Sequence, residues 1–219
     1  MPPSRSSPGL LTLHALRLSG MSDEAAVARR FALLPTEVAE LLLDFQAYGW
    51  VTRVEFAGSR GWTLTENGKA EGERRLAAEL TDTGAGPSVR SVHEVFLPLN
   101  ARFQTACTRW QIRPLPGEPM AANDHTDHRW DDRVIDELGS LGRRLAPLCA
   151  DLAERLQRFD GYAGRYAAAM DRVERGERGW VDGVGLDSCH RVWFELHEDL
   201  LATLGIPRGE EPDVSASPH

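Results

Sequence analysis

The apolar residues of this chain change from helical spacing to a strand-like period of two in one place, and this change limits the fold more than any other feature. Trp50, Val54 and Phe56 fall on one face of a strand, and Thr52 departs from this pattern only by its polarity. A glycine-containing turn follows at 57–61, and Trp62 and Leu64 belong to a return strand. A period of two indicates a strand, and two such runs joined by a glycine-containing turn predict a hairpin. Helical spacing surrounds this hairpin, so we expect a mainly α fold.

Three helices are predicted before the hairpin and one directly after it. The first covers Leu10–Leu18 and ends at Gly20, and the second has Ser22 as its candidate N-cap. The third begins near Pro35 and ends before Gly49, because proline is favoured at the first position of a helix and glycine directly after its last turn. Its apolar residues follow the i, i+3, i+4, i+7 spacing of an amphipathic helix: Val38, Leu41, Leu42 and Phe45. Thr65 can cap the fourth helix, which we expect to continue through Leu80.

The residues LLLDFQAYGWV, the glycine-rich turn and the residues GWTLTENGKAEGE resemble the MarR- and PadR-like winged-helix regulators. The resemblance covers roughly residues 10–80, and the LTENGK element is moderately specific for the fold. It implies a winged helix-turn-helix of three helices and a hairpin wing. It also implies that the third helix enters the major groove of DNA while the wing contacts the backbone.

Composition changes along the chain predict five segments. We expect a flexible leader at 1–8, the winged helix-turn-helix at 9–80 and a Gly/Pro/Ser/Thr-rich linker at 81–88. An α-helical bundle for ligand binding or dimerisation follows at 89–205, and a disordered polar tail at 206–219. The predicted fold class is therefore mainly α, with a winged helix-turn-helix followed by a helical bundle.

The expected recognition helix is acidic, which opposes DNA binding. No Lys or Arg lies between Leu33 and Gly49, and the net charge of the whole chain is -8. Phosphate contacts dominate affinity for DNA, so positive charge has to come from elsewhere. The candidate DNA-binding residues are Arg29, Arg30, Thr36, Arg53, Arg60 and Lys69. The alternative is a winged helix that serves as a scaffold or protein contact and does not bind DNA.

Two long runs of apolar residues at heptad-like spacing follow the linker. One covers Val92–Trp110, with Pro98 as a start or kink. The other covers Val134–Leu152 and predicts either one long helix or two stacked pieces broken near Gly142 or Pro147. Such spacing suits either the core of an antiparallel bundle or a dimer seam. We therefore expect a homodimer, with packing inside one chain as the alternative.

The ligand-binding prediction rests on aromatic and uncharged polar residues of this second half. Large aromatic rings with a few polar groups are typical of small-molecule pockets, and they are also good core residues. A neutral polar stripe lies beside the first apolar run, and two histidines share an aromatic face of the last helix, which begins near Ser188. The candidates are Asn100, Gln104, Trp110, Trp180, His190, Trp193 and His197.

Other chemistry is less well supported by the sequence. The segment Asn123–Asp132 is dense in metal-capable groups, but it precedes a helix, where carboxylates are ordinary partners of the helix dipole. Cys189 lies in the first turn of the last helix, where it is either a redox-sensitive thiolate or a buried, inert thiol. The common catalytic motifs are missing, so we predict no enzyme, catalytic residue, metal or cofactor; an enzyme using His190, His197 and Cys189 is the least supported alternative.

The remaining composition favours a cytoplasmic protein. There are three cysteines, no signal peptide pattern and no apolar run long enough to cross a membrane. The predicted function is a dimeric winged-helix transcriptional regulator that binds DNA and an unknown small-molecule effector. The alternative is a ligand-sequestering or protein-interaction module whose winged helix does not bind DNA.

Overall fold

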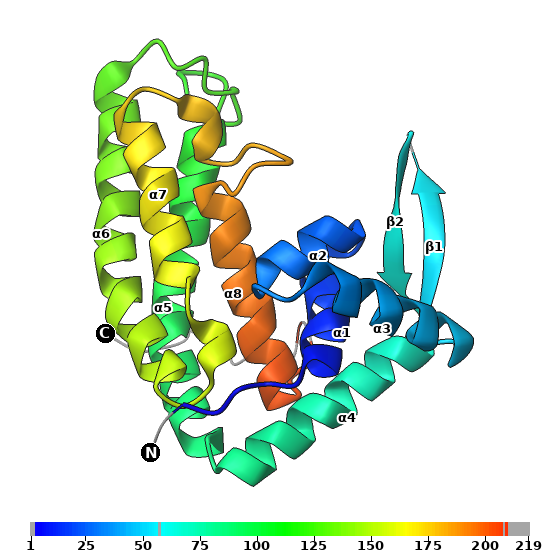
Figure 1. Cartoon of the computed structure of the whole chain (residues 1–219). Coiled ribbons are helices and arrows are strands. Elements are labelled where there is room, and N and C mark those ends of the chain that lie inside the picture. Colours follow the sequence, from blue (N-terminus) through cyan, green and yellow to red (C-terminus); the bar gives the residue numbers. More distant parts are fainter. Residues whose placement is uncertain (1–2, 57, 208, 210–219) are drawn as a thin grey trace. The chain divides into compact units, whose positions relative to one another are not determined.

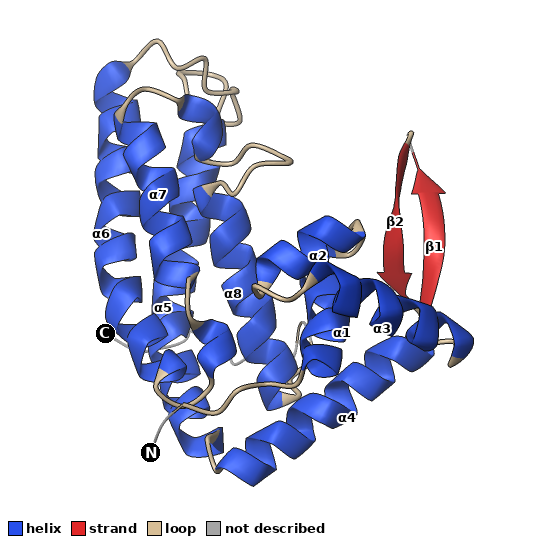
Figure 2. Cartoon of the chain, in the orientation of Figure 1, coloured by secondary structure: helices blue, strands red, loops and turns tan. Residues whose placement is uncertain are grey.

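The computed structural model describes residues 3–56, 58–207 and 209, and its regular elements are mostly helices (Figure 2). The predicted tail lies almost wholly outside these residues. The elements follow in the order α1 (Pro8–Ser19), α2 (Glu24–Arg30), α3 (Pro35–Ala47), β1 (Val51–Phe56), β2 (Ser59–Leu64), α4 (Glu66–Thr83), α5 (Gly86–Gln111), α6 (His128–Ala153), η1 (Gln157–Phe159), α7 (Tyr162–Glu174), η2 (Arg178–Trp180) and α8 (Cys189–Leu204).

The chain forms two compact units, and both are discontinuous in sequence. The N-terminal unit runs through residue 89 and adds residues 153–158 and 198–209, whereas the helical unit contains 90–152 and 159–197. Of the predicted linker 81–88, only Gly84 and Ala85 lie outside α4 and α5. Ser4, in the predicted leader, forms a parallel β-bridge with Leu156.

The N-terminal unit has three helices, an antiparallel hairpin and a closing helix, which is the order of a winged helix (Figure 1). The hairpin register pairs Val51 with Leu64 and Phe56 with Ser59. Helices α1–α3 and the hairpin share one apolar core, in which Leu13, Val38 and Leu42 are fully buried. The mainly α fold class is therefore confirmed, with the hairpin where the alternation predicted it.

The caps explain where the elements of this unit begin. The Oγ1 atom of Thr65 accepts from the backbone N–H of Gly68 at 3.1 Å, so the predicted cap of α4 is confirmed. The predicted cap of α2 is wrong by one residue, because Asp23 accepts from the backbone N–H of Ala26 at 2.7 Å. The backbone of Ser22 instead pairs with Trp62, through bonds of 3.1 and 2.8 Å, and so extends the edge of the hairpin.

The helical unit is built from α5, α6, α7 and the first part of α8, which lie side by side in Figure 1. Helices α5 and α6 continue through Pro98 and Pro147, so neither proline divides its helix in two. The apolar seam of α6 is buried inside this single chain, with Leu138, Leu141 and Leu145 fully covered. Packing within the chain therefore accounts for the heptad-like spacing. In the part of the chain that the structure describes, no helix has the length and apolar character needed to cross a membrane.

Candidate functional site

The exposed face of α3 carries acidic and apolar side chains. Thr36, Glu40 and Asp44 are exposed, and Leu43 on the same face has 54% of its surface accessible. Tyr48, directly after the helix, is 65% exposed. Apart from Thr36, this face offers no predicted DNA-binding residue, and its carboxylates would repel a phosphate backbone.

The two wing arginines project into solvent, but each lies beside a carboxylate. The side chain of Arg60 is 82% exposed, and its Nε donates to Glu55 at 2.9 Å. Arg53 is 63% exposed; its guanidinium lies 4.6 Å from the ring centroid of Trp62 and 3.9 Å from Glu24. Exposed pairs of this kind are weak, about 0–1 kcal/mol, so a phosphate can replace the carboxylate. Neither pair therefore holds its arginine tightly.

The other predicted DNA-binding residues differ in accessibility. Arg29 and Lys69 are exposed. Arg30 is half-buried, its guanidinium lies 4.5 Å from the ring centroid of Phe31, and two of its nitrogens are buried. Arg30 is therefore positioned toward the interior of the N-terminal unit and is poorly placed for a phosphate.

Four of the predicted ligand-binding residues border one aromatic cluster of the helical unit. Trp193 is buried; its ring stacks on Phe103 with 4.4 Å between centroids, and its Nε1 donates to Asn100 Oδ1 at 3.0 Å. Rings of His190 and His197 lie 6.4 and 5.4 Å from those of Phe103 and Phe96. Asn100 and Trp193 are both buried and hydrogen-bonded to each other, so in this structure they are part of the hydrophobic core of the helical unit.

The remaining three predicted ligand-binding residues lie elsewhere. Gln104 is exposed on α5, and Trp180 is half-buried with the guanidinium of Arg172 5.2 Å from its ring centroid. Trp110 is buried, and its ring lies 4.4 Å from that of His125. The described contacts therefore join Trp110 to a different group of residues.

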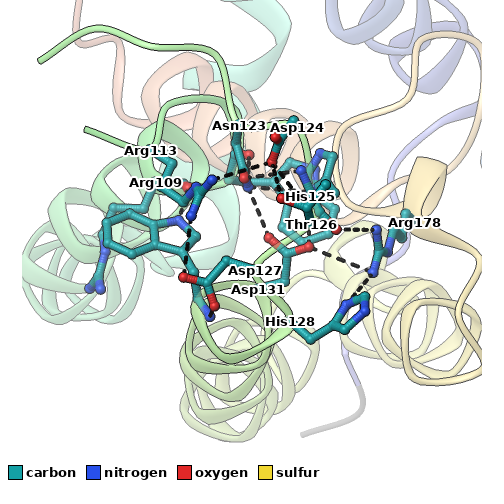
Figure 3. A network of polar contacts seen from close by, with 12 residues as sticks. Arg109, Arg113, Asn123, Asp124, His125, Thr126, Asp127, His128, Asp131 and Arg178 are labelled. Carbon is teal, nitrogen blue, oxygen red and sulfur yellow. Dashed lines mark hydrogen bonds and ion pairs between the residues drawn. The ribbon is translucent and has the colours of Figure 1, made fainter. Parts of the chain in front are cut away.

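That group is a polar cluster around the buried carboxylate of Asp131, in the first turn of α6 (Figure 3). Asp131 is 1% exposed, and its two oxygens lie 2.9 Å from Asn123 Nδ2 and 3.0 Å from His125 Nδ1. Asn123 also donates to the backbone carbonyl of Trp110 at 2.9 Å. The cluster thus fastens the segment between α5 and α6 to the end of one helix and the start of the other.

His125 is the least ordinary residue of this cluster. Its φ of 57° lies in the left-handed region, which costs a non-glycine residue about 1 kcal/mol or more. The carboxylate of Asp131 and the ring of Trp110 hold it there, and Arg178 Nη1 donates to its backbone carbonyl at 3.1 Å. An imidazole oriented by a buried carboxylate can bind a polar group through its other nitrogen.

The charges of the cluster are mostly paired with each other. Arg113 lies 3.4 Å from Asp124 and 3.3 Å from Asp127, and Arg178 lies 3.7 Å from Asp131. Within the described residues, no three His, Cys, Asp or Glu side chains are grouped to hold a metal ion. In the structure these metal-capable side chains instead make hydrogen bonds and ion pairs with one another and with the two arginines. The two arginines come from segments that carried no sequence signal for this cluster.

The cysteines are free and buried. Burial raises the pKa of the Cys189 thiol to about 12, despite its place in the first turn of α8. A thiol with this pKa stays protonated near neutral pH and is a poor nucleophile. Of the two alternatives for Cys189, the geometry favours the inert thiol.

The chain was compared with models of protein families, with curated proteins and with solved structures, and none of them matches it.

Proposed function

We propose that this chain is a winged-helix regulator of transcription that binds DNA through its wing, and whose helical unit binds a small-molecule effector. The observation that carries the DNA contact is the exposure of the wing arginines, with 63% of the Arg53 side chain and 82% of the Arg60 side chain accessible. Arg29 and Lys69 add exposed positive charge in the same unit. Homodimerisation, as in many DNA-binding proteins with two half-sites, belongs to this proposal.

The acidic face of α3 determines what kind of binding to expect. Glu40 and Asp44 lower the affinity, so the phosphate contacts of the wing have to supply most of it. A contact of this kind is sensitive to salt, with a slope in log K against log salt of about -0.9 for each phosphate neutralised. We therefore expect binding at low ionic strength that weakens steeply as salt is added.

The test is fluorescence anisotropy of labelled duplex DNA from the promoter region of the protein's own gene, measured from about 50 to 200 mM salt. Replacing both wing arginines, as Arg53→Ala with Arg60→Ala, should weaken binding and reduce the salt slope by about 2, because two phosphate contacts are lost. The matched control is Arg144→Ala, an exposed arginine of α6 in the helical unit. No binding by the unaltered protein at low salt, or an unchanged slope in the wing variant, would contradict the proposal.

A second function is favoured by one observation, the combination of exposed apolar and acidic side chains on α3. Leu43 and Tyr48 are 54% and 65% exposed beside Glu40 and Asp44. Such a surface suits a protein partner with apolar and basic side chains better than it suits a polyanion. If the unaltered protein fails to bind DNA at low salt, this protein-interaction module becomes the better proposal.

A further inference from the structure

A groove in the helical unit, between α5 and α6, has the size of a small-molecule site. Its volume is about 590 Å³, and it is lined by residues 101–109 of α5 and 133–137 of α6. Ligand pockets usually measure about 300–1,000 Å³. The groove contains none of the residues that the sequence suggested for ligand binding, and of the residues labelled in Figure 3 it is lined by Arg109 alone.

Three arginines line this groove, and they fall into two classes. Arg102 is paired with Glu137 through two hydrogen bonds of 2.9 and 3.1 Å. Arg109 and Arg133 have no carboxylate within ion-pair distance among the described residues. Both instead lie against the ring of Trp130, with 4.9 and 5.7 Å between guanidinium carbon and ring centroid. The groove therefore holds two guanidinium groups whose charge is not neutralised by a carboxylate.

Two hydrogen bonds hold Trp130, and the guanidinium groups of Arg109 and Arg133 both lie against its ring. Its indole Nε1 donates to the backbone carbonyl of Arg109 at 2.8 Å, and its backbone N–H donates to Asp127 Oδ1 at 3.2 Å. Asp127 also pairs with Arg113 in the polar cluster (Figure 3). Through Asp127, the polar cluster positions the start of α6 so that the indole of Trp130 contacts the end of α5. A guanidinium that is held in advance loses less entropy when it binds an anion.

We propose that this groove binds a small molecule with one oxyanion head, either a carboxylate or a phosphate, and a short apolar body. The head lies between Arg109 and Arg133, because a guanidinium donates two parallel hydrogen bonds to such a group. The body lies along Ala101, Ala106 and Val134, which supply the apolar part of the lining. Asp136 also lines the groove, so a second anionic group on the ligand would be repelled.

This inference names the effector class for the sensing role proposed above, and so rests on it. The binding can be measured without DNA, so the two proposals can fail separately. A protein that binds the anion but not DNA would refute the regulator and leave the groove intact. A protein that binds DNA but not the anion would refute the groove alone.

The experiment is calorimetric titration of the full chain with four probes: hexanoate, hexyl phosphate, inorganic phosphate and hexylamine. We expect saturable binding of hexanoate or hexyl phosphate, and the tighter of the two tells which head the site takes. Inorganic phosphate, which has no apolar body, should bind at least ten times more weakly. Hexylamine, which has the same body and a positive charge, should not bind.

Two variants and one control make the assignment specific. Arg109→Ala and Arg133→Ala should each weaken binding of the preferred probe at least tenfold. Arg144→Ala removes an exposed arginine of the same helix α6 that does not line the groove, and it should leave binding unchanged. Circular dichroism establishes that each variant is folded. Failure of both anionic probes to saturate, equal binding of hexylamine, or unchanged binding in both groove variants would overturn the proposal.

Discussion

Asp199 forms a buried ion pair that contributes to the stability of the N-terminal unit. Its side chain is fully buried and pairs with Arg158, while His14 Nε2 lies 3.0 Å from the same oxygen. Arg158 also lies 3.1 Å from Glu79 and donates to Thr203 at 2.8 Å. Burial alone would raise the pKa of the Asp199 carboxyl, but the charges of Arg158 and His14 outweigh it and hold this pKa well below its usual range.

The first prediction concerns this carboxylate. Asp199→Asn should lower the free energy of unfolding by about 3–5 kcal/mol at pH 7, because it leaves part of the charge of buried Arg158 uncompensated. Urea unfolding followed by circular dichroism measures the loss. Asp132→Asn is the matched control, since Asp132 is exposed on α6, and it should change the free energy by less than about 0.5 kcal/mol.

The same pair predicts a pH dependence with a definite sign. Because the folded-state pKa of Asp199 is depressed, its contribution to stability is complete above the unfolded-state pKa of about 4. It is lost as the pH falls from there toward the folded-state pKa. The difference in stability between the unaltered protein and Asp199→Asn should therefore shrink as the pH falls below about 4. A difference that grows as the pH falls from about 4 would contradict this role.

At the scale of elements, the junction between the hairpin and α4 depends on a glycine. Gly68, in the LTENGK segment, lies so close to the chain that an added Cβ would overlap the carbonyl of Trp50. The Oγ1 of Thr65 also binds the carbonyl of Gly49 at 2.6 Å, which draws the start of α4 against the end of α3. The glycine is therefore required by close packing of backbone on backbone.

The second prediction compares two glycines of α4. Gly68→Ala should lower the free energy of unfolding by about 1–3 kcal/mol, because the backbone has to shift to admit the methyl group. Gly72→Ala in the same helix should raise it by about 0.5–1 kcal/mol, since alanine is the better helix former. At position 72 the nearest atom to an added Cβ is Leu13 Cβ at 3.9 Å, so the methyl group has room. Urea unfolding of both variants tests the contrast, and equal effects would refute it.

At the scale of the whole molecule, the N-terminal unit is completed by distant parts of the sequence. Ala202 of α8 packs with Leu10 and Leu76 in one apolar cluster, and Arg17 lies 3.1 Å from Glu198. Asp199 comes from the same end of α8, and Arg158 comes from η1. A winged helix cut out at its apparent sequence boundary would lose these partners.

The third prediction follows because residues 153–158 and the end of α8 belong to the N-terminal unit. A fragment of residues 1–88 should unfold without a cooperative transition or at a much lower urea concentration than the full chain, because it exposes Leu10 and Leu76 and leaves His14 without Asp199. Tryptophan fluorescence of Trp50 and Trp62 reports on this unit in the fragment. A fragment with the same midpoint as the full chain would show that residues 153–158 and 198–207 contribute nothing to its stability.

The sequence determined the local elements of this protein. The change of period at Trp50 predicted the hairpin, Pro35 and Gly49 enclosed α3, and Thr65 predicted the start of α4. The heptad-like run Val134–Leu152 predicted the buried face of α6. These features depend on short-range spacing, caps and turn chemistry, which are complete within a few residues, so they could be predicted from the chain alone.

Only the tertiary structure decided which of these elements belong together and which side chains meet. Asn100 and Trp193 are far apart in sequence and pair in the interior, whereas Arg109 and Arg133 meet at Trp130 without any motif. Asp199 and Arg158 close the N-terminal unit although both lie far beyond its apparent end. A long-range contact depends on how whole faces pack, and a side chain's charge or polarity does not specify its partner.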